Sequence, residues 1–177
     1  MIATNRLILR DWQASDHAPF NVMGRDPEVM AFLGPLQSQS DTDASIARLQ
    51  GIAATHGHTF WAIERRSDAA FLGFCGLKIA PDGIVGIAGA IEIGWRLRRD
   101  AWGLGLAHEA ALASLEWGWA NLDTDRIIAI TTPGNVRSQA LMRRLGMVRH
   151  LDLDFDHPAL AVDDPLRPHV TFEVFRP

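Results

Sequence analysis

The sequence has very little cysteine and no tyrosine, and both gaps exclude classes of protein. Cys75 is the only cysteine among the 177 residues, so no disulfide forms within the chain and a cysteine-rich zinc site cannot be built. A small secreted fold that depends on disulfides is therefore excluded. The complete absence of tyrosine excludes any mechanism in which a tyrosine hydroxyl donates a proton.

Positive charge and long apolar segments are also scarce. Lys78 is the only lysine, and 17 basic against 21 acidic residues leave a net charge of −4. General nucleic-acid binders are usually basic, so we expect no nucleic-acid partner. The longest uncharged run, residues 49–63, is too short and too polar to span a bilayer. The first residues lack the basic and apolar regions of a signal peptide, so we expect a cytoplasmic protein with no membrane partner.

The remaining composition is that of an ordinary globular protein. Apolar residues make up 47% and charged residues 21% of the chain, which is enough apolar material for a sizeable core. The length, together with the absence of repeats and low-complexity linkers, predicts a single domain over residues 1–177. A homodimer is one arrangement that such a small, apolar-rich chain allows.

Hydrophobic spacing predicts strands and helices that are interleaved along the chain. Alternating or aromatic and β-branched segments predict strands at residues 7–9, 59–64, 70–79, 87–97, 127–131, 147–155 and 169–175. Helical spacing and capping residues predict helices at 15–23, from 27, from 41, at 102–121 and at 135–145. This order predicts one mixed α/β domain, in which a sheet of about seven strands carries helices on its faces.

The most informative segment joins a predicted strand to the longest predicted helix. The chain passes through Arg98 and Arg99 into a turn with glycine at 103 and 105. Unpaired amides in the first turn of a helix bind anions, and glycine lets a phosphate approach the backbone closely. No Gly-Lys-Ser/Thr follows, so the turn is not a P-loop. On spacing alone, tight packing at a strand-to-helix turn explains these glycines equally well.

Four segments in order resemble the GNAT N-acetyltransferase family, over almost the whole chain. Glu92–Trp95 followed by Trp102–Ala110 resembles the acetyl-CoA motif of that family, and residues 135–138 with 144–147 resemble a second block. Residues 4–10 and 26–30 resemble the RimJ/RimL-like branch, which acetylates the N-termini of ribosomal proteins. The resemblance implies a twisted mixed sheet with splayed central strands.

The resemblance also implies a co-substrate and its place. Acetyl-CoA would lie in a splay between the predicted strands 87–97 and 127–131, and Gly94 would mark a bulge that opens them. Its pyrophosphate would rest on the amides of residues 103–107, and its pantetheine would pair with the backbone around residues 93–97. The implied cofactor-binding residues are Ile93, Trp95, Leu97, Arg98, Arg99, Trp102, Gly103, Leu104, Gly105, Leu106, Ala107, Asn135 and Ser138.

The implied reaction is direct attack of a neutral amine on the thioester within a ternary complex. Glu92 is the candidate base, and the alternative is a structural ion pair with an arginine such as Arg96. Many GNAT enzymes use a tyrosine to protonate the departing thiolate, and Ser138 is the hydroxyl that matches here. The alternative for Ser138 and Asn135 is a capped helix start.

The acceptor is the least defined part of this interpretation. Residues 155–158 resemble a loop that precedes the final strand in this branch, and Asp156 and His157 are the candidates to line the acceptor pocket; the alternative is an ordinary turn. We expect a primary amine, either a protein N-terminus or a small molecule, and no metal. The alternative function is a non-catalytic acyl-CoA-binding sensor or regulatory module.

Overall fold

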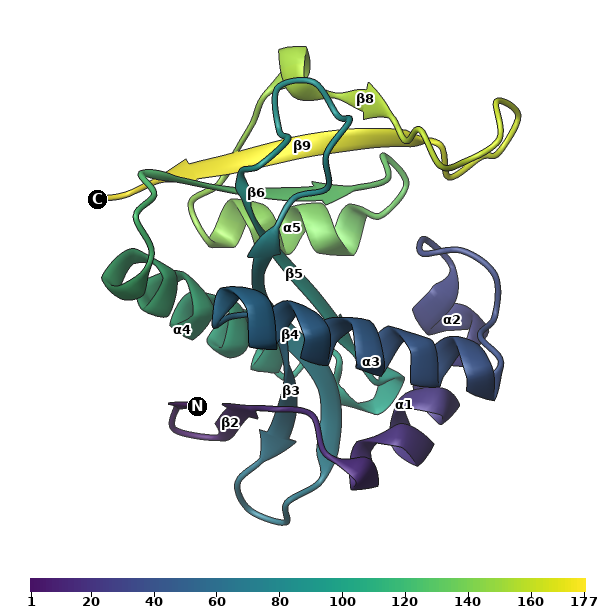
Figure 1. The fold of residues 1–177 in the computed structure, drawn as a ribbon, viewed down its shortest axis with the longest axis vertical. Coiled ribbons are helices and arrows are strands. Elements are labelled where there is room, and N and C mark those ends of the chain that lie inside the picture. Colours follow the sequence, from purple (N-terminus) through teal and green to yellow (C-terminus); the bar gives the residue numbers. More distant parts are fainter.

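One sheet runs through the whole molecule and places two parallel strands at its centre. The computed structural model describes residues 1–177 (Figure 1). The strands are β1 (Ile2–Ala3), β2 (Leu7–Arg10), β3 (Phe60–Arg65), β4 (Phe71–Ile79), β5 (Ile91–Leu97), β6 (Arg126–Thr131), β7 (Val148–Arg149), β8 (Phe155–Asp156) and β9 (Pro168–Phe175). Their order is β1-β2-β3-β4-β5-β6-β9-β7, and β8 pairs with β9. Only β5 and β6 pair in parallel.

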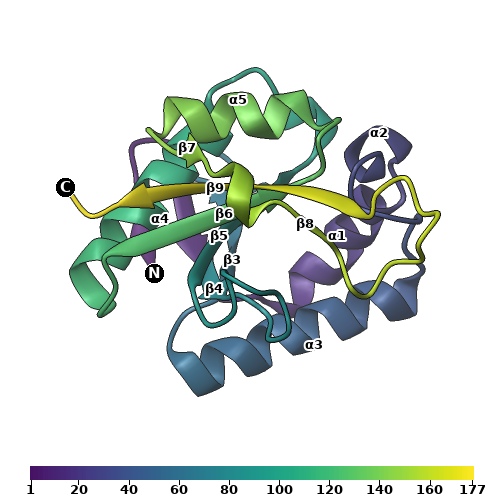
Figure 2. The same ribbon diagram turned by 90° about the horizontal axis from the view of Figure 1, so that it is seen from above.

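Helices cover both faces of this sheet, as the sequence predicts. The helices are α1 (His17–Gly24), α2 (Pro27–Met30), α3 (Gln39–His56), α4 (Leu106–Asn121) and α5 (Val136–Arg144). Figure 2 shows α5 and α3 on opposite sides of the strands. The larger core cluster joins α4 and α5 to one face, and a second cluster of mainly aromatic residues joins α1 and α3 to the other. No helix of the structure combines the length and the apolar character that crossing a membrane requires.

The splay between the central strands is present. β5 and β6 pair only through Ile91 with Ile127 and Glu92 with Ile128, so the ladder ends at Glu92. In Figure 1, β3–β5 run along the long axis of the molecule, whereas β6 and β9 cross near its top. The remainder of β5 therefore has a hydrogen-bonded neighbour only on its β4 side.

Gly94 does not mark a bulge, which corrects the prediction for that residue. The β4–β5 register is continuous from Ile91 to Leu97. A Cβ at Gly94 would lie 2.6 Å from Cζ of Phe60, so glycine is required there for the packing of an aromatic ring. The strands separate because β6 diverges, and not because β5 is irregular.

The structure also corrects the bounds of three predicted elements. The strand predicted at 87–97 begins at Ile91, because Gly86 and Gly89 adopt positive φ and the side chain of Ile87 is buried in a small separate cluster. The helix predicted at 102–121 begins at Leu106. The helix predicted from residue 41 begins at Gln39, because Ser38 and Asp41 form a capping box.

The strand predicted at 147–155 is wrong. This segment forms the two-residue β7, a 3₁₀ turn at Leu151–Leu153 and then β8. The carboxylate of Asp154 accepts a hydrogen bond from the amide of Thr171 at 3.0 Å and pairs with Arg149. At this point of β9, a side chain therefore takes the place of a backbone partner from a neighbouring strand. The side chain of Leu151 is exposed and is not part of an apolar face.

Candidate active site

A row of backbone amides without acceptors opens α4. Gly103 and Gly105 both adopt left-handed backbone conformations, with φ of +74° and +75°, and Gly105 occupies the N-cap position. No acceptor within the chain takes up the amides of residues 103–108, whereas the amide of Glu109 donates to the carbonyl of Gly105. Free amides combined with the positive end of a helix dipole favour a phosphate group. The turn therefore fits the predicted place of a pyrophosphate.

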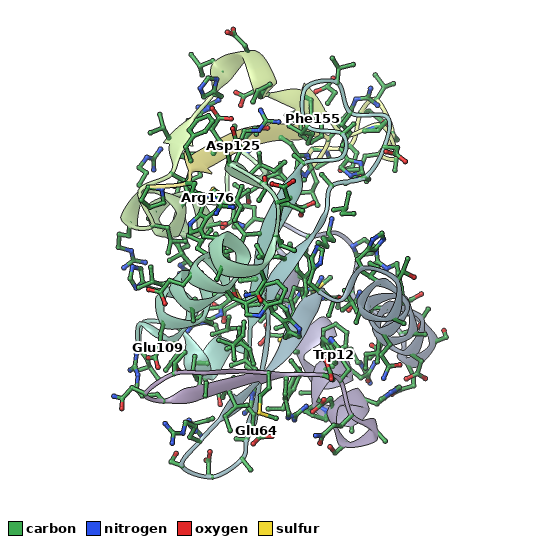
Figure 3. The ribbon with its side chains drawn as sticks, turned by 60° about the vertical axis from the view of Figure 1, so that its left-hand side comes forward. Trp12, Glu64, Glu109, Asp125, Phe155 and Arg176 are labelled. Carbon is green, nitrogen blue, oxygen red and sulfur yellow. The ribbon has the colours of Figure 1, made fainter.

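The N-terminal segment fastens this turn to the sheet. Glu109 accepts hydrogen bonds from Thr4 Oγ1 at 2.6 Å, from the Arg6 amide at 2.8 Å and from Arg6 Nε at 2.6 Å. Arg6 Nη1 in turn donates to the carbonyl of Leu104 at 2.9 Å. Burial opposes the charge of Glu109, but the bonds from Thr4 and Arg6 outweigh it and hold the pKa of Glu109 below its usual range. Figure 3 shows Glu109 beside this N-terminal segment.

The free edge of β5 presents backbone groups to the splay. In an antiparallel ladder, every second residue pair is hydrogen-bonded. At the two ends of the β4–β5 ladder, the carbonyl of Ala90 accepts the amide of Ala80, and the amide of Arg98 donates to the carbonyl of Leu72. The backbone groups of the even-numbered β5 residues therefore bond to β4, whereas the backbone of Trp95 and the amide of Leu97 point into the splay. The carbonyl of Leu97 accepts the indole N–H of Trp102 at 2.8 Å. This free edge is where the resemblance places pantetheine.

Glu92 lies at the point where the central strands separate. It is 7% exposed, and its Oε2 accepts a hydrogen bond from Lys78 Nζ at 2.5 Å. Its structural partner is thus the only lysine, opposite on β4, and not the arginine considered from the sequence. Oε1 makes no bond within the chain and is not sealed from solvent. One carboxylate oxygen therefore remains open for a further proton donor.

The loop before β9 brings His157 towards Glu92. Burial lowers the pKa of His157, the charges of His169 and Lys78 lower it further, and the charge of Glu92 opposes them. The Ala159 amide donates to Nδ1 of His157 at 3.3 Å. Asp156 is instead exposed and pairs with Arg167 at 3.2 Å. This loop lies on the same side of the molecule as α2 in Figures 1 and 2.

The start of α5 supplies hydroxyl groups near the end of β6. Asn135 caps the helix by accepting the amide of Ser138 at 3.2 Å, so the capping interpretation holds for Asn135. The hydroxyl of half-buried Ser138 makes no hydrogen bond within the chain and remains available. Thr132, which the sequence reasoning missed, is 3% exposed and its hydroxyl has no partner. No sequence pattern marks Thr132, because an unpaired buried hydroxyl is visible only in the fold.

The predicted basic residues beside the turn already have acidic partners. Arg98 pairs with Asp100 at 2.7 Å, and Arg99 pairs with Glu28 at 2.9 Å. Arg137 makes no ion pair and stacks over the ring of Trp102 with 5.0 Å between Cζ and the ring centroid. Arg137 is therefore a free cation next to the turn. The sequence places it in the second motif block but gives no sign of this contact.

No group of three or more histidine, cysteine, aspartate or glutamate side chains is arranged to hold a metal ion. Burial raises the pKa of the Cys75 thiol to about 12, so this cysteine is not a nucleophile at neutral pH. The groups that this site leaves available for binding or chemistry are therefore the amide turn, the free edge of β5, and the side chains of Glu92, His157 and Ser138.

Comparison with known proteins agrees with this geometry. Residues 6–148 match the family model described as an acetyltransferase (GNAT) domain. An uncharacterized protein of Bacillus subtilis (strain 168), YkkB, is 31% identical over 147 residues, which are 82% of this chain and 84% of that protein.

Two solved structures share the fold at low sequence identity. The spermidine N-acetyltransferase of Vibrio cholerae, in complex with CoA and spermine, aligns with a TM-score of 0.73 at 12% identity, over 97% of this chain and 96% of that one. The ribosomal-protein-S5-alanine acetyltransferase of Vibrio fischeri aligns with a TM-score of 0.74 at 16% identity, over 98% and 94% of the two chains. Because the family model covers most of the sequence, the chain belongs to the GNAT acetyltransferase family.

Proposed function

We propose that this protein transfers the acetyl group of acetyl-CoA directly to a primary amine within a ternary complex. The observation that carries the proposal is the splay of β5 from β6, which opens beside the amide turn of α4 and has Glu92 at its apex. Acetyl-CoA supplies the acetyl group as an activated thioester. The amides of residues 103–108 and the backbone of Trp95 hold this co-substrate, because neither set is fully used by the chain itself.

The side chains of the site act on the attacking amine and on the departing sulfur, which leaves as a thiolate and takes its proton from water. An amine attacks only as the neutral base, so Glu92 Oε1 accepts its proton directly or through a water molecule. Lys78 fixes the other oxygen and orients the carboxylate. The hydroxyl of Ser138 donates a hydrogen bond to the departing sulfur, which takes the place of the missing tyrosine. Arg137 adds positive charge for the phosphates of the co-substrate.

The resemblance to the RimJ/RimL-like branch implies that the acceptor is the N-terminal amine of a protein. In this structure, Thr4 and Arg6 of the motif at residues 4–10 bond to the start of α4, which gives this motif a structural role. We therefore propose a primary amine in general, and derive its class separately below.

The direct test measures free thiol release by the purified protein with acetyl-CoA and a panel of peptides, amino acids and polyamines. We expect release that depends on the amine, with the N-acetylated product confirmed by mass spectrometry. Tight acetyl-CoA binding without amine-dependent release over the whole panel would contradict the proposal. That outcome would favour the acyl-CoA-binding sensor, for which the Lys78–Glu92 ion pair is the supporting observation.

A further inference from the structure

Arg96 is a largely buried cation for which the chain supplies no counter-ion. Its guanidinium lies between the rings of Phe20 and Phe74, with 5.7 Å and 5.3 Å from Cζ to the ring centroids. Nη1 donates to the neutral Gln37 side chain at 3.2 Å, and Nε is sealed from solvent without any acceptor. Nη2 makes no bond within the chain and is not sealed, so it is the open end of the guanidinium.

The surroundings of Arg96 add positive charge and no free acid. Residues 17–25 and 31–38, which pack on this side of the sheet, contain no aspartate or glutamate. Of the two acids between these segments, Asp26 caps α2 and Glu28 pairs with Arg99. On α3, Asp43 pairs with His17, and Asp41 belongs to the capping box at Ser38. Arg48 is exposed, has no ion pair and repels Arg96. Burial, together with the smaller effect of the Arg48 charge, lowers the pKa of Arg96 to about 10.

Arg96 also shares a strand face with the proposed base. Glu92, Gly94 and Arg96 alternate on β5 towards the α1 and α3 side, and the ring of Phe60 packs over Gly94 between the two charged side chains. The Cα atoms of Glu92 and Arg96 are about 13 Å apart at the rise of a β-strand. A short molecule that lies over the Phe60 ring is long enough to reach both side chains.

We propose that Arg96 binds an anionic group of the acceptor, and that the acceptor is a short amine that carries a carboxylate. An unpaired, largely buried guanidinium costs stability unless a partner neutralises it, and guanidinium binds carboxylate through strong directional bonds. Arg48 contributes long-range attraction for the same group. This inference rests on the proposed function, and it argues against a polyamine, which the two free arginines would repel.

The test compares acids with matched neutral amines at saturating acetyl-CoA. The panel pairs glycine, β-alanine, 4-aminobutyrate and several α-amino acids with their carboxamides, and thiol release gives kcat/KM for each. We expect the best acid to exceed its amide by at least ten-fold. Arg96→Gln reduces this ratio to within about three-fold, and acetyl-CoA affinity measured by calorimetry stays within two-fold of wild type.

Two further variants keep the test decisive if Arg96→Gln folds poorly. Arg48→Gln changes an exposed residue, and we expect it to lower the acid-to-amide ratio two- to five-fold. Arg144→Gln, on the exposed side of α5, is the matched control and leaves the ratio unchanged. Equal or better use of the amides, or an undiminished ratio in both Arg96→Gln and Arg48→Gln, would overturn the inference.

Failure of the proposed function would be visible separately, as the absence of thiol release with every amine. In that case, calorimetric titration of the same acids and amides into the acetyl-CoA-loaded protein tests the anion site alone. A ten-fold preference for an acid that Arg96→Gln removes would support the site, whereas binding of no acid would overturn it.

Discussion

Glu92 illustrates, at the scale of single residues, how far a sequence position can be interpreted. The resemblance makes Glu92, on the central strand, the candidate base, and the structure places this residue at the apex of the splay. The predicted alternative of an ion pair is also present, but its partner is Lys78 because the β4–β5 register sets these two residues opposite each other. Register across a hairpin depends on turn geometry, which the sequence pattern alone left open.

Replacing Glu92 by glutamine removes the proposed base while keeping the size of the side chain. We expect kcat to fall by about 10²–10⁴-fold, because general base catalysis contributes that much, and acetyl-CoA affinity to stay within two-fold. Thiol release and calorimetry measure the two quantities. Glu116→Gln, an exposed position on α4, is the matched control. Unchanged turnover in Glu92→Gln would refute the assignment of the base.

His58 makes the stability of the protein depend on pH. It is buried, its Nδ1–H donates to the His56 carbonyl at 2.9 Å, and its Nε2 has no partner. Burial lowers the pKa of His58 below its usual value of 6.5. As the pH falls through about 6.5, the unfolded chain binds this proton more readily than the folded one, so stability present at higher pH is lost.

We expect this loss to reach at most about 1.4 kcal/mol per pH unit for one proton. Urea unfolding at pH 7.5 and pH 5.5 measures it. His58→Asn keeps the N–H donor and removes the titrating ring, so it loses less stability over this range than wild type. His56→Asn, at an exposed position, is the control: it removes only the smaller effect of the His56 charge on the pKa of His58, so it follows wild type more closely than His58→Asn does. An identical pH dependence in wild type and His58→Asn would count against this explanation.

At the scale of elements, the long helices and central strands follow their sequence patterns, but their ends do not. The periodicity of α4 continues back to Trp102, yet the helix begins at Leu106 because Gly103 and Gly105 turn the chain into left-handed conformations. Alternation of Leu151, Leu153 and Phe155 resembles a strand, but Asp154 between them accepts the amide of the distant Thr171, and Asp156 after them bonds to Arg167. Such long-range bonds override local spacing and cannot be read from it.

The αL backbone of Gly105 is required to direct the free amides of the α4 turn. An alanine at φ +75° is strained by about 1–2 kcal/mol, so the turn relaxes and the amides move. We expect Gly105→Ala to weaken acetyl-CoA binding at least ten-fold in a calorimetric titration. Gly83→Ala is the matched control, because Gly83 has φ +92° and open space around its Cβ position but lies in a different loop. Equal affinities for the two variants would show that the turn does not bind the co-substrate.

At the scale of the whole molecule, the sequence predicts the single domain, the helices on both faces and the central splay. It does not predict that the splay separates the sheet into two groups of strands. β1–β5 and β6–β9 are joined by only two register positions, and the cluster that includes α4 and α5 holds them together behind the opening. The unpaired Arg96, the partner of Glu92 and the free hydroxyl of Thr132 arise from this arrangement of distant segments. No local sequence pattern predicts these three features.

The central claim is that acetyl-CoA occupies the splay and completes the free edge of β5. Amide hydrogen exchange, followed by NMR with and without acetyl-CoA, tests this claim most directly. Without acetyl-CoA, the amides of Trp95 and Leu97 should exchange faster than those of Gly94 and Arg96, which bond to β4. We predict that acetyl-CoA slows exchange at Trp95 and Leu97 at least ten-fold and changes Gly94 and Arg96 little. Saturation with acetyl-CoA that leaves Trp95 and Leu97 unprotected would contradict the account.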